Sequence, residues 1–397
     1  MFDLLKIKVS GFKLLEDNFE IDFTTKARVY QEDKAKEIRE VDRGLYVFKS
    51  YAFVGGNSSG KSTVLLLILK TLLFLQTGRW KYEPREFKSN KIELNIVFYL
   101  DNYLYDYKAM FSKLGEEKMS SDNKYSPIKE ISFFRRFYNK SKGVKNLELL
   151  YSDLEGRENL EKIYIEPSLE DTSAIKKLTS DKVKVDDFSN NNISNFNETI
   201  LRNTFFTSLN SCNKELASAI IRLLDDSIEY ILYDNLDHVR FKRFNEPEEL
   251  ISNVDLMSIL SSGTFRGVEL YIRCINALKN GKTIIVDEIE NCFQKMLVFN
   301  LLILFNDEII NNNGAKLIFS THYIEILDYL NRRDGIFITH KVKGVINVKN
   351  LYSDYCVRTE LSKSRQFDNN VFDTIINYNL MLEVRRALLN ELQINND

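Results

Sequence analysis

The stretch GGNSSGKST, residues 55–63, decides the fold of this chain. It fits the pattern G-x-x-x-x-G-K-[ST], in which the backbone N–H groups of a glycine-rich loop wrap around phosphates. A short apolar segment, residues 51–54, precedes it, and a leucine-rich segment from residue 64 follows, as a strand and a helix would. The alternative is a Gly/Ser turn with an accidental lysine. We predict a nucleotide-binding loop formed by Gly55, Asn57, Ser59, Gly60, Lys61, Ser62 and Thr63.

Residues that could act on a bound nucleotide occur in this loop and in TIIVDEIEN, residues 283–291. The ammonium of Lys61 can reach the β and γ oxygens, and the hydroxyl of Ser62 can ligate Mg²⁺. Asp287 ends an apolar strand, so it can hold Mg²⁺ at the edge of a sheet. Glu288 follows directly and suits a general base that orients water. The alternative for these two carboxylates is the first turn of a capped helix, where Asp and Glu are favoured.

A third apolar strand is predicted in LIFSTHYIEIL, residues 317–327, and it carries His322 to the same edge of the sheet. There His322 could sense a γ-phosphate or stabilise charge during phosphoryl transfer. A histidine after a strand can also be purely structural. We prefer the catalytic role because the chain has only 3 histidines.

The stretch LSSGT, residues 260–264, opens a predicted helix and offers a second phosphate site. Free N–H groups and the helix dipole both favour an anion at a helix N-terminus. The chain already has a better phosphate-binding loop at residues 55–63, which leaves open whose phosphate this second site would bind. Read alone, the stretch is an ordinary helix N-cap.

Hydrophobic periodicity predicts the fold class. Residues 4–9, 19–23 and 91–111 alternate apolar and polar side chains, which indicates antiparallel strands. Apolar strands at residues 283–286 and 315–320 alternate with helices, which indicates a parallel sheet covered on both faces. We predict an α/β fold with a mixed, largely parallel sheet flanked by helices, an antiparallel N-terminal sheet and an inserted subdomain. The expected parts are residues 1–110 and 251–345 as one head, 111–250 as the insertion or helical subdomain, and 346–397 as a C-terminal extension.

Composition limits the class of protein. The chain has 397 residues, 44% of them hydrophobic, and a net charge of -2, so no global field draws it to nucleic acid or anionic membrane. Its 4 cysteines are far apart in sequence and suggest neither a zinc site nor a disulfide framework. The longest apolar run, residues 64–75, is too short to span a bilayer, and we find no secretion signal. We expect a cytoplasmic protein with no membrane partner.

The order of these motifs resembles the ABC-type ATPase family. GGNSSGKST looks like its P-loop, LSSGT like its signature, IIVDE like its Walker B with the catalytic glutamate, and STH like its switch histidine. The resemblance implies ATP and Mg²⁺ as cofactors, with Lys61, Glu288 and His322 as catalytic residues and Ser62 and Asp287 at the metal. It also implies a homodimer or higher oligomer in which two heads sandwich ATP. The signature residues Ser262 and Gly263 would then act in trans.

A narrower resemblance joins the chain to prokaryotic ABC-type ATPases of the OLD (overcoming lysogenization defect) family. It rests on SGFKLLEDNFEIDF, VGGNSSGKST, LSSGT, VDEIEN, LIFSTHYIEILD and RRDGIFITHK, and covers roughly residues 1–110 and 255–350. This group includes ATPase subunits of phage-defence systems of the AbiL and PARIS AriA types. It implies an abortive-infection sensor that controls a separately encoded effector, such as a Toprim-type nuclease. The alternative is an SMC-like, repair-type ATPase that binds DNA.

The sequence departs from the family pattern at two positions. Gln294 stands where a histidine is often found after the D-loop. No Q-loop glutamine can be placed, because Gln76 comes too early and residues 101–245 contain none. This leaves one Mg²⁺ ligand unassigned and disfavours the motor of a membrane transporter, since transporters couple through that loop.

Three further segments can each be interpreted in more than one way. Residues 24–44 are charged and are interpreted as a solvated excursion. The stretch FFRRFYNKSKGVK, residues 133–145, could bind a nucleic-acid backbone, although a solvated face over an aromatic core is the preferred interpretation. In the tail, a basic turn precedes an amphipathic helix that could pack on its own head or dock a partner. Its apolar positions include Ile375, Ile376, Leu380, Leu382 and Leu388.

Overall fold

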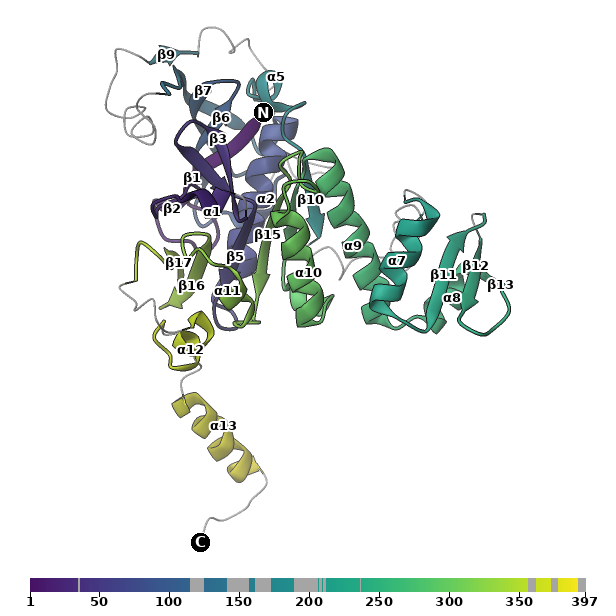
Figure 1. Cartoon of the computed structure of the whole chain (residues 1–397). Coiled ribbons are helices and arrows are strands. Elements are labelled where there is room, and N and C mark those ends of the chain that lie inside the picture. Colours follow the sequence, from purple (N-terminus) through teal and green to yellow (C-terminus); the bar gives the residue numbers. More distant parts are fainter. Residues whose placement is uncertain are drawn as a thin grey trace.

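A parallel sheet and an antiparallel sheet form the body of the molecule, with a smaller lobe at one side and a C-terminal arm below (Figure 1). The structure is a computed structural model. It describes residues 1–34, 36–114, 125–140, 157–160, 173–188, 206, 209, 212–235, 237–355, 362–372 and 378–391.

The parallel sheet carries the predicted motifs. Its order is β10 (Val185–Phe188), β14 (Thr283–Val286), β15 (Lys316–Thr321), β5 (Ser50–Val54), β16 (Ile336–Val342) and β17 (Val345–Asn350). The first five strands run parallel, and β17 returns antiparallel to β16. The carboxyl ends of β14, β15 and β5 therefore meet at one edge of the sheet. The predicted α/β fold with a largely parallel sheet is confirmed.

The antiparallel sheet contains both predicted N-terminal hairpins and extends beyond them. Its order is β2 (Phe19–Asp22), β1 (Phe2–Ser10), β6 (Lys91–Leu100), β7 (Tyr103–Ser112), β8 (Ile128–Phe137) and β9 (Glu158–Asn159). Two of these strands, β8 and β9, were not expected in the sheets of the head, and neither was β10, because all three come from residues 111–250. Parts of that segment therefore complete the two sheets, and its treatment as one separate insertion stays a prediction.

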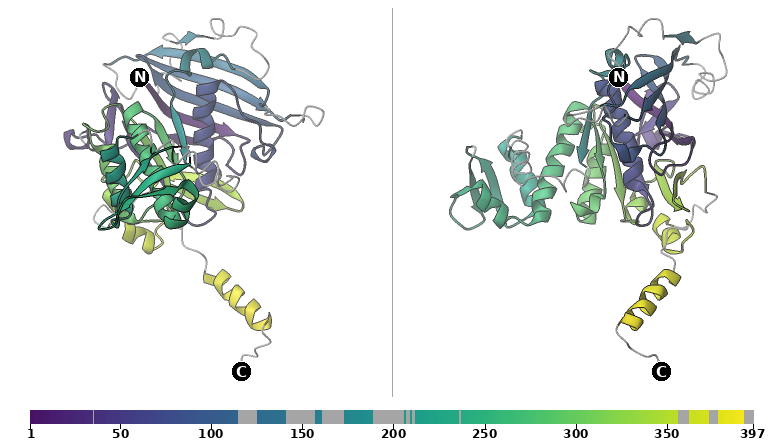
Figure 2. Two further views of the ribbon diagram at one scale, coloured as in Figure 1. Left: turned by 90° about the vertical axis from the view of Figure 1, so that its right-hand side faces the viewer. Right: turned by 180° about the vertical axis from the view of Figure 1, so that it is seen from behind.

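Two hydrophobic cores lie on opposite faces of the parallel sheet. The side chains of β5 alternate between them: Tyr51 and Phe53 face one core, and Ala52 and Val54 the other. The first core also holds α2 (Lys61–Thr77), which is apolar around its whole circumference, as expected for a helix buried against two sheets. The second core holds α9 (Ser262–Asn280) and α10 (Lys295–Asn306), which cover the other face (Figure 2).

A side lobe precedes α9 in the chain and lies beside it. Three strands, β11 (Ile228–Tyr233), β12 (His238–Arg243) and β13 (Glu249–Ser252), form its antiparallel sheet. The helices α7 (Lys214–Leu224) and α8 (Asn253–Ile259) flank this sheet. The other short helices are α1 (Gln31–Lys34), η1 (Pro84–Glu86), α5 (Lys176–Thr179), η4 (Ile289–Asn291) and α11 (Ile326–Tyr329).

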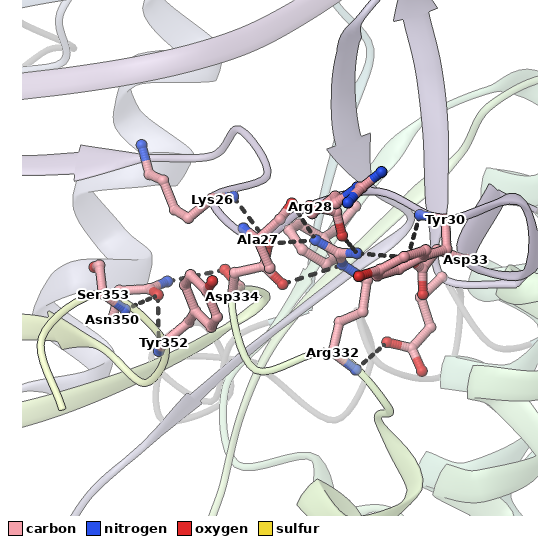
Figure 3. Close-up of polar contacts among 12 residues, drawn as sticks. Lys26, Ala27, Arg28, Tyr30, Asp33, Arg332, Asp334, Asn350, Tyr352 and Ser353 are labelled. Carbon is pink, nitrogen blue, oxygen red and sulfur yellow. Dashed lines mark hydrogen bonds and ion pairs between the residues drawn. The ribbon is translucent and has the colours of Figure 1, made fainter. Parts of the chain in front are cut away.

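The charged segment after β2, residues 24–44, contacts Arg332 of the head (Figure 3). For the residues that make this contact, the expectation of a solvated excursion is wrong. The side chain of Arg332 is buried and forms ion pairs of 2.7 Å with both Asp33 and Asp334. It also donates to the backbone carbonyls of Ala27 and Arg28. Every charge in this cluster has a partner, which lets it be buried. The adjoining strands β3 (Ile38–Asp42) and β4 (Leu45–Phe48) form a separate hairpin.

The C-terminal segment forms two helices, α12 (Lys363–Asp368) and α13 (Tyr378–Glu391). In both figures α13 projects away from the head as an arm. Ile375 and Ile376, two of the apolar positions predicted for this helix, lie outside the described residues. Within the described part of the chain, no helix combines the length and apolar character needed to cross a bilayer.

Candidate functional site

The glycine-rich loop is shaped by close contacts that only glycine permits. Gly60 has φ of 109°, and a Cβ there would lie 2.5 Å from the side chain of Ile346 on β17. At Gly55 a Cβ would lie 2.5 Å from the hydroxyl of Thr339 on β16. That hydroxyl also forms a 2.6 Å hydrogen bond with Ser59. The β16–β17 hairpin therefore packs against the loop and supports it. Sequence patterns did not reveal this contact.

The N-terminus of α2 is built to receive an anion. Its N-cap, Gly60, provides no side-chain hydrogen bond to the first turn. The loop residues Asn57 and Ser58 are exposed, while Ser62 and Thr63 are half-buried. The N–H groups of the first helical turn thus lack a side-chain cap, and the helix dipole adds partial positive charge at the same point.

Lys61 is buried at the floor of this loop, and its ammonium donates to the carbonyls of Gly55 and Gly56 at 3.0 and 3.1 Å. Burial lowers the pKa of Lys61, and the nearby carboxylates of Asp287 and Glu288 partly oppose that shift. Its hydrogen-bond partners are neutral carbonyls, which a phosphate oxygen can replace with a stronger, charge-assisted bond.

One hydroxyl positions the two carboxylates after β14. Ser320, fully buried on β15, donates a 2.5 Å hydrogen bond to Oδ1 of Asp287 and accepts one of 2.7 Å from the N–H of Glu288. Asp287 is itself buried. Ser320 thus fixes the side chain of one carboxylate and the backbone of the other. Sequence analysis gave Ser320 no role, although it lies in the same stretch as His322.

Glu288 is held in a backbone conformation that few non-glycine residues adopt, with φ of 51°. Asn291 stabilises it twice: its side-chain amide donates to Oε2 of Glu288 at 2.7 Å, and its backbone N–H donates to the carbonyl of Glu288 at 2.9 Å. Backbone strain of this kind costs about 1–3 kcal/mol and clusters at functional sites. Asn291 is a second positioning residue that the sequence did not identify.

His322 lies exposed at the mouth of the site, directly after β15. Its backbone N–H donates a 2.6 Å hydrogen bond to Oε1 of Glu290. The other oxygen of Glu290, Oε2, is buried and has no hydrogen-bond partner in the described part of the chain. Glu290 therefore anchors the loop of His322 and adds negative potential beside Asp287 and Glu288.

A hollow of about 250 Å³ brings the predicted residues together. Its walls include Lys61, Ser62, Glu288 and His322, and the lining is completed by Leu14, Asn57, Ser58, Ser59, Gly60, Thr63, Lys341 and Ile346. Gly55, Asp287 and Gly263 are not among its lining residues.

The LSSGT turn lies at the same end of the molecule as the P-loop (Figure 1). Helix α9 ends just before β14 begins, so its N-terminus must lie toward the carboxyl edge of the sheet. Ser261 is the N-cap, and its hydroxyl accepts from the N–H of Thr264 at 3.0 Å. Ser262 opens the helix and Gly263 is exposed. The capping role therefore falls to Ser261, which sequence analysis did not single out.

The residues predicted at the metal suit Mg²⁺. Ser62 and Asp287 offer hard oxygen donors, and Glu288 and Glu290 add negative charge beside them. The unpartnered Oε2 of Glu290 shows that this negative charge is incompletely compensated. Within the described residues no group of three or more His, Cys, Asp or Glu could hold a metal by itself. That suits Mg²⁺, which keeps several waters and is commonly shared between one or two protein ligands and substrate phosphates.

Comparison with known proteins now identifies the family. Residues 50–328 match the model of the family described as "AAA domain, putative AbiEii toxin, Type IV TA system". The chain belongs to this AAA-domain family. The matched residues begin at β5 and end within α11, so they contain the P-loop, Glu288 and His322. The AAA domain also includes the side lobe, whereas the first strands and the C-terminal arm lie beyond the match.

Among solved structures, the SMC head domain from Thermotoga maritima is similar, with 13% sequence identity and a TM-score of 0.42. The alignment covers 87% of this chain and 98% of that chain. No curated protein matches the sequence.

Proposed function

We propose that this AAA-domain protein hydrolyses ATP as a dimer of heads and serves as the sensor subunit of a bacterial anti-phage, abortive-infection system. In this role it controls a separately encoded effector, such as a nuclease. One observation carries the ATPase proposal: Lys61, Ser62, Glu288 and His322 line a single hollow at the N-terminus of α2.

Each group in the hollow has a place in the hydrolysis of ATP. Lys61 and the uncapped N–H groups of α2 bind the phosphates and neutralise their charge. Glu288, held by Ser320 and Asn291, orients a water molecule for in-line attack on the γ-phosphate. His322 stands at the mouth, where it can stabilise the departing phosphate. Ser62 and Asp287 would hold Mg²⁺, which supplies further charge neutralisation when bound.

A second copy of the chain would complete the site. Ser262 and Gly263 open a helix of 19 residues, whose N-terminus favours an anion, and Gly263 lines no part of the hollow in its own head. Two heads placed head to tail would bring this helix to the γ-phosphate bound by the other P-loop. ATP would then act as the bridge of a homodimer.

The biological role rests on the family and on the sequence resemblance. The family description names a putative toxin of a Type IV TA system, which supports a protein that acts together with another component. Purification of the native complex, with its mass measured in ATP and in ADP, tests for a separately encoded partner. A complex whose composition does not change with the nucleotide would contradict control by ATP.

The DNA-binding alternative gains no support from the basic stretch on β8. Arg135 pairs with Glu158 at 2.6 Å and stacks over the ring of Tyr103. Its guanidinium therefore already has partners within the protein. Lys142 and Lys145 lie outside the described residues. DNA-stimulated ATP turnover that disappears on reversing the charges of Arg135 and Arg136 would favour the alternative.

Glu288→Gln tests the ATPase proposal directly. The variant keeps the shape of the side chain but removes the base, so we expect hydrolysis to fall about 100-fold or more while ATP-bound dimers accumulate. Phosphate release and light scattering measure these two effects. Glu325→Gln, an exposed change on the turn after His322, is the control and should behave as the parent. Parent-like hydrolysis by Glu288→Gln would show that the assignment is wrong.

A further inference from the structure

Helix α13 carries a row of exposed apolar side chains. Met381, Val384 and Leu388 are 52%, 61% and 54% exposed. Their spacing of three and four residues places them on one face of the helix. No described residue of the chain covers this row. A continuous apolar stripe on a projecting helix, unlike single exposed apolar residues, marks a contact surface.

A groove that could receive such a helix lies on the far side of the same molecule. Helices α7 and α9 approach closely at one end, where a Cβ on Gly267 would lie 2.9 Å from Leu224. Farther along they diverge, and α10 closes the base of an apolar groove of about 540 Å³. Leu216, Ile220, Ile275 and Leu304 are among its lining residues. Leu223 and Ile310, also in its lining, are 46% and 43% exposed.

The arm starts beside the nucleotide site. Phe367 and Asp368 of α12 line one hollow together with Gly55, Gly56 and His322. Phe367 is buried, and α12 is also held to α11, where Ser364 hydrogen-bonds to Asp328. The base of the arm is therefore fixed to the head at the edge where ATP would bind.

The direction of the arm decides which groove it can reach. All views show α13 extending beyond the carboxyl edge of the parallel sheet, and Figure 1 shows it on the side opposite α7. It therefore lies away from the groove of its own head. In a two-fold, head-to-tail dimer, the P-loop side of one copy faces the α9 N-terminal side of the other. The arm of the first copy then extends along the α7 side of the second.

We propose that α13 of one copy docks into the groove between α7, α9 and α10 of a second copy. Met381, Val384 and Leu388 enter the groove, and the two-fold axis repeats the contact so that the two copies exchange arms. This inference rests on the proposed ATP-bridged dimer and adds the surface that holds it. Because α12 lines one hollow together with the P-loop glycines, the exchanged arm also links each nucleotide site to the opposite head.

Charge substitutions on either surface test the proposal in full-length protein carrying Glu288→Gln. We expect the double variant Val384→Asp, Leu388→Asp and the groove variant Leu223→Asp each to weaken ATP-dependent dimerisation at least tenfold, measured by light scattering over a range of concentrations. Binding of ATP to the monomer should not change. Arg386→Asp, which adds the same charge to the opposite face of α13, is the matched control. Dimerisation equal to the control in both variants would overturn the exchange and leave the ATPase proposal standing.

A photo-cross-linking amino acid identifies the docking partner. An untagged chain carrying p-benzoylphenylalanine in place of Val384 is mixed with a tagged chain in ATP, and the cross-linked peptides are mapped by mass spectrometry. We expect adducts with α7, α9 or α10 of the tagged chain. Adducts confined to the probe's own chain, or to α13 of the tagged chain, would overturn the proposal. Failure of the Glu288→Gln chain to form any ATP-dependent dimer would instead reject the proposed dimer and the exchange with it.

Discussion

The first turns of α2 and α9 are both suited to phosphate, but only the first turn of α9 has a side-chain cap. The first turn of α2 has no side-chain cap and lies over the buried ammonium of Lys61. The first turn of α9 is capped by Ser261 and opens to solvent at Gly263. The comparison teaches that the first turn of α2 leaves its donors to water or to a ligand, whereas the first turn of α9 satisfies one of its own with Ser261. Helix α9 carries its own cap, and in the proposed dimer it would meet the phosphate bound by the other head.

Replacing the glycine of each turn by alanine should give the largest difference. A Cβ on Gly60 meets Ile346 at 2.5 Å and occupies a left-handed backbone, so the loop must shift. At Gly263 the nearest atom outside the helix backbone is 3.7 Å away. We expect Gly60→Ala to reduce monomer ATP affinity about 100-fold or more, and Gly263→Ala to leave it unchanged, in calorimetric titrations. Equal losses would remove the distinction between the two turns.

Ser262→Arg tests the role of α9 in trans. The large cation at the start of the helix should block the approach of a second nucleotide-loaded head. We expect ATP binding by the monomer to stay intact while dimer-dependent hydrolysis falls about 100-fold, as when a catalytic hydrogen-bond donor is removed. Nucleotide titration and turnover at increasing protein concentration measure the two effects. A loss of ATP affinity in the monomer would place Ser262 in its own head's site instead.

The pH dependence of ATP binding should report the burial of Lys61. Burial lowers the pKa of this ammonium in the free protein, whereas bound phosphate favours its charged form. ATP binding therefore takes up a proton in alkaline solution, and affinity falls by up to about tenfold per pH unit between the lowered pKa and that of an ordinary lysine. Calorimetry at pH about 9 in buffers of different ionisation enthalpy detects the uptake. Lys61→Arg stays protonated and should show none; equal uptake would assign the proton elsewhere.

Removing the cap of α9 should have the smallest effect. Ser261→Ala deletes the acceptor for the N–H of Thr264, which costs about 1 kcal/mol of stability. We expect thermal denaturation to shift down by about 2 °C, with monomer ATP affinity unchanged. A larger loss of affinity than of stability would show that Ser261 contacts the nucleotide of its own head.

Sequence patterns predicted the elements that carry the motifs. The apolar run Thr283–Val286 is β14, and the helix after the P-loop is α2. These predictions succeed because each depends on local periodicity and on one motif whose backbone must follow a strand. The carboxyl ends of β5, β14 and β15 then share one edge as a consequence of parallel pairing. The roles of Lys61, Glu288 and His322 stay predictions.

Other features depend on which segments meet in space. Strand β10 is short and contains two aspartates, and it becomes visible only through its pairing with β14, where Val185 lies opposite Thr283. Ser320 reads as an ordinary strand residue until β15 is placed beside β14. The left-handed backbone of Glu288 likewise follows from the hydrogen bonds that Ser320 and Asn291 provide. No local pattern encodes these contacts.

The central position of β5 has a consequence for the synthesis of the chain. Its neighbours are β15 and β16: Val54 lies opposite Thr321 on one side and Ile338 on the other. Both neighbours leave the ribosome long after the P-loop does, and pairings so distant in sequence form late in folding. A nascent chain that stops before Lys316 has the glycine-rich loop but neither of the two strands that pair with β5. We therefore expect the loop to bind nucleotide only in chains whose translation has passed β16.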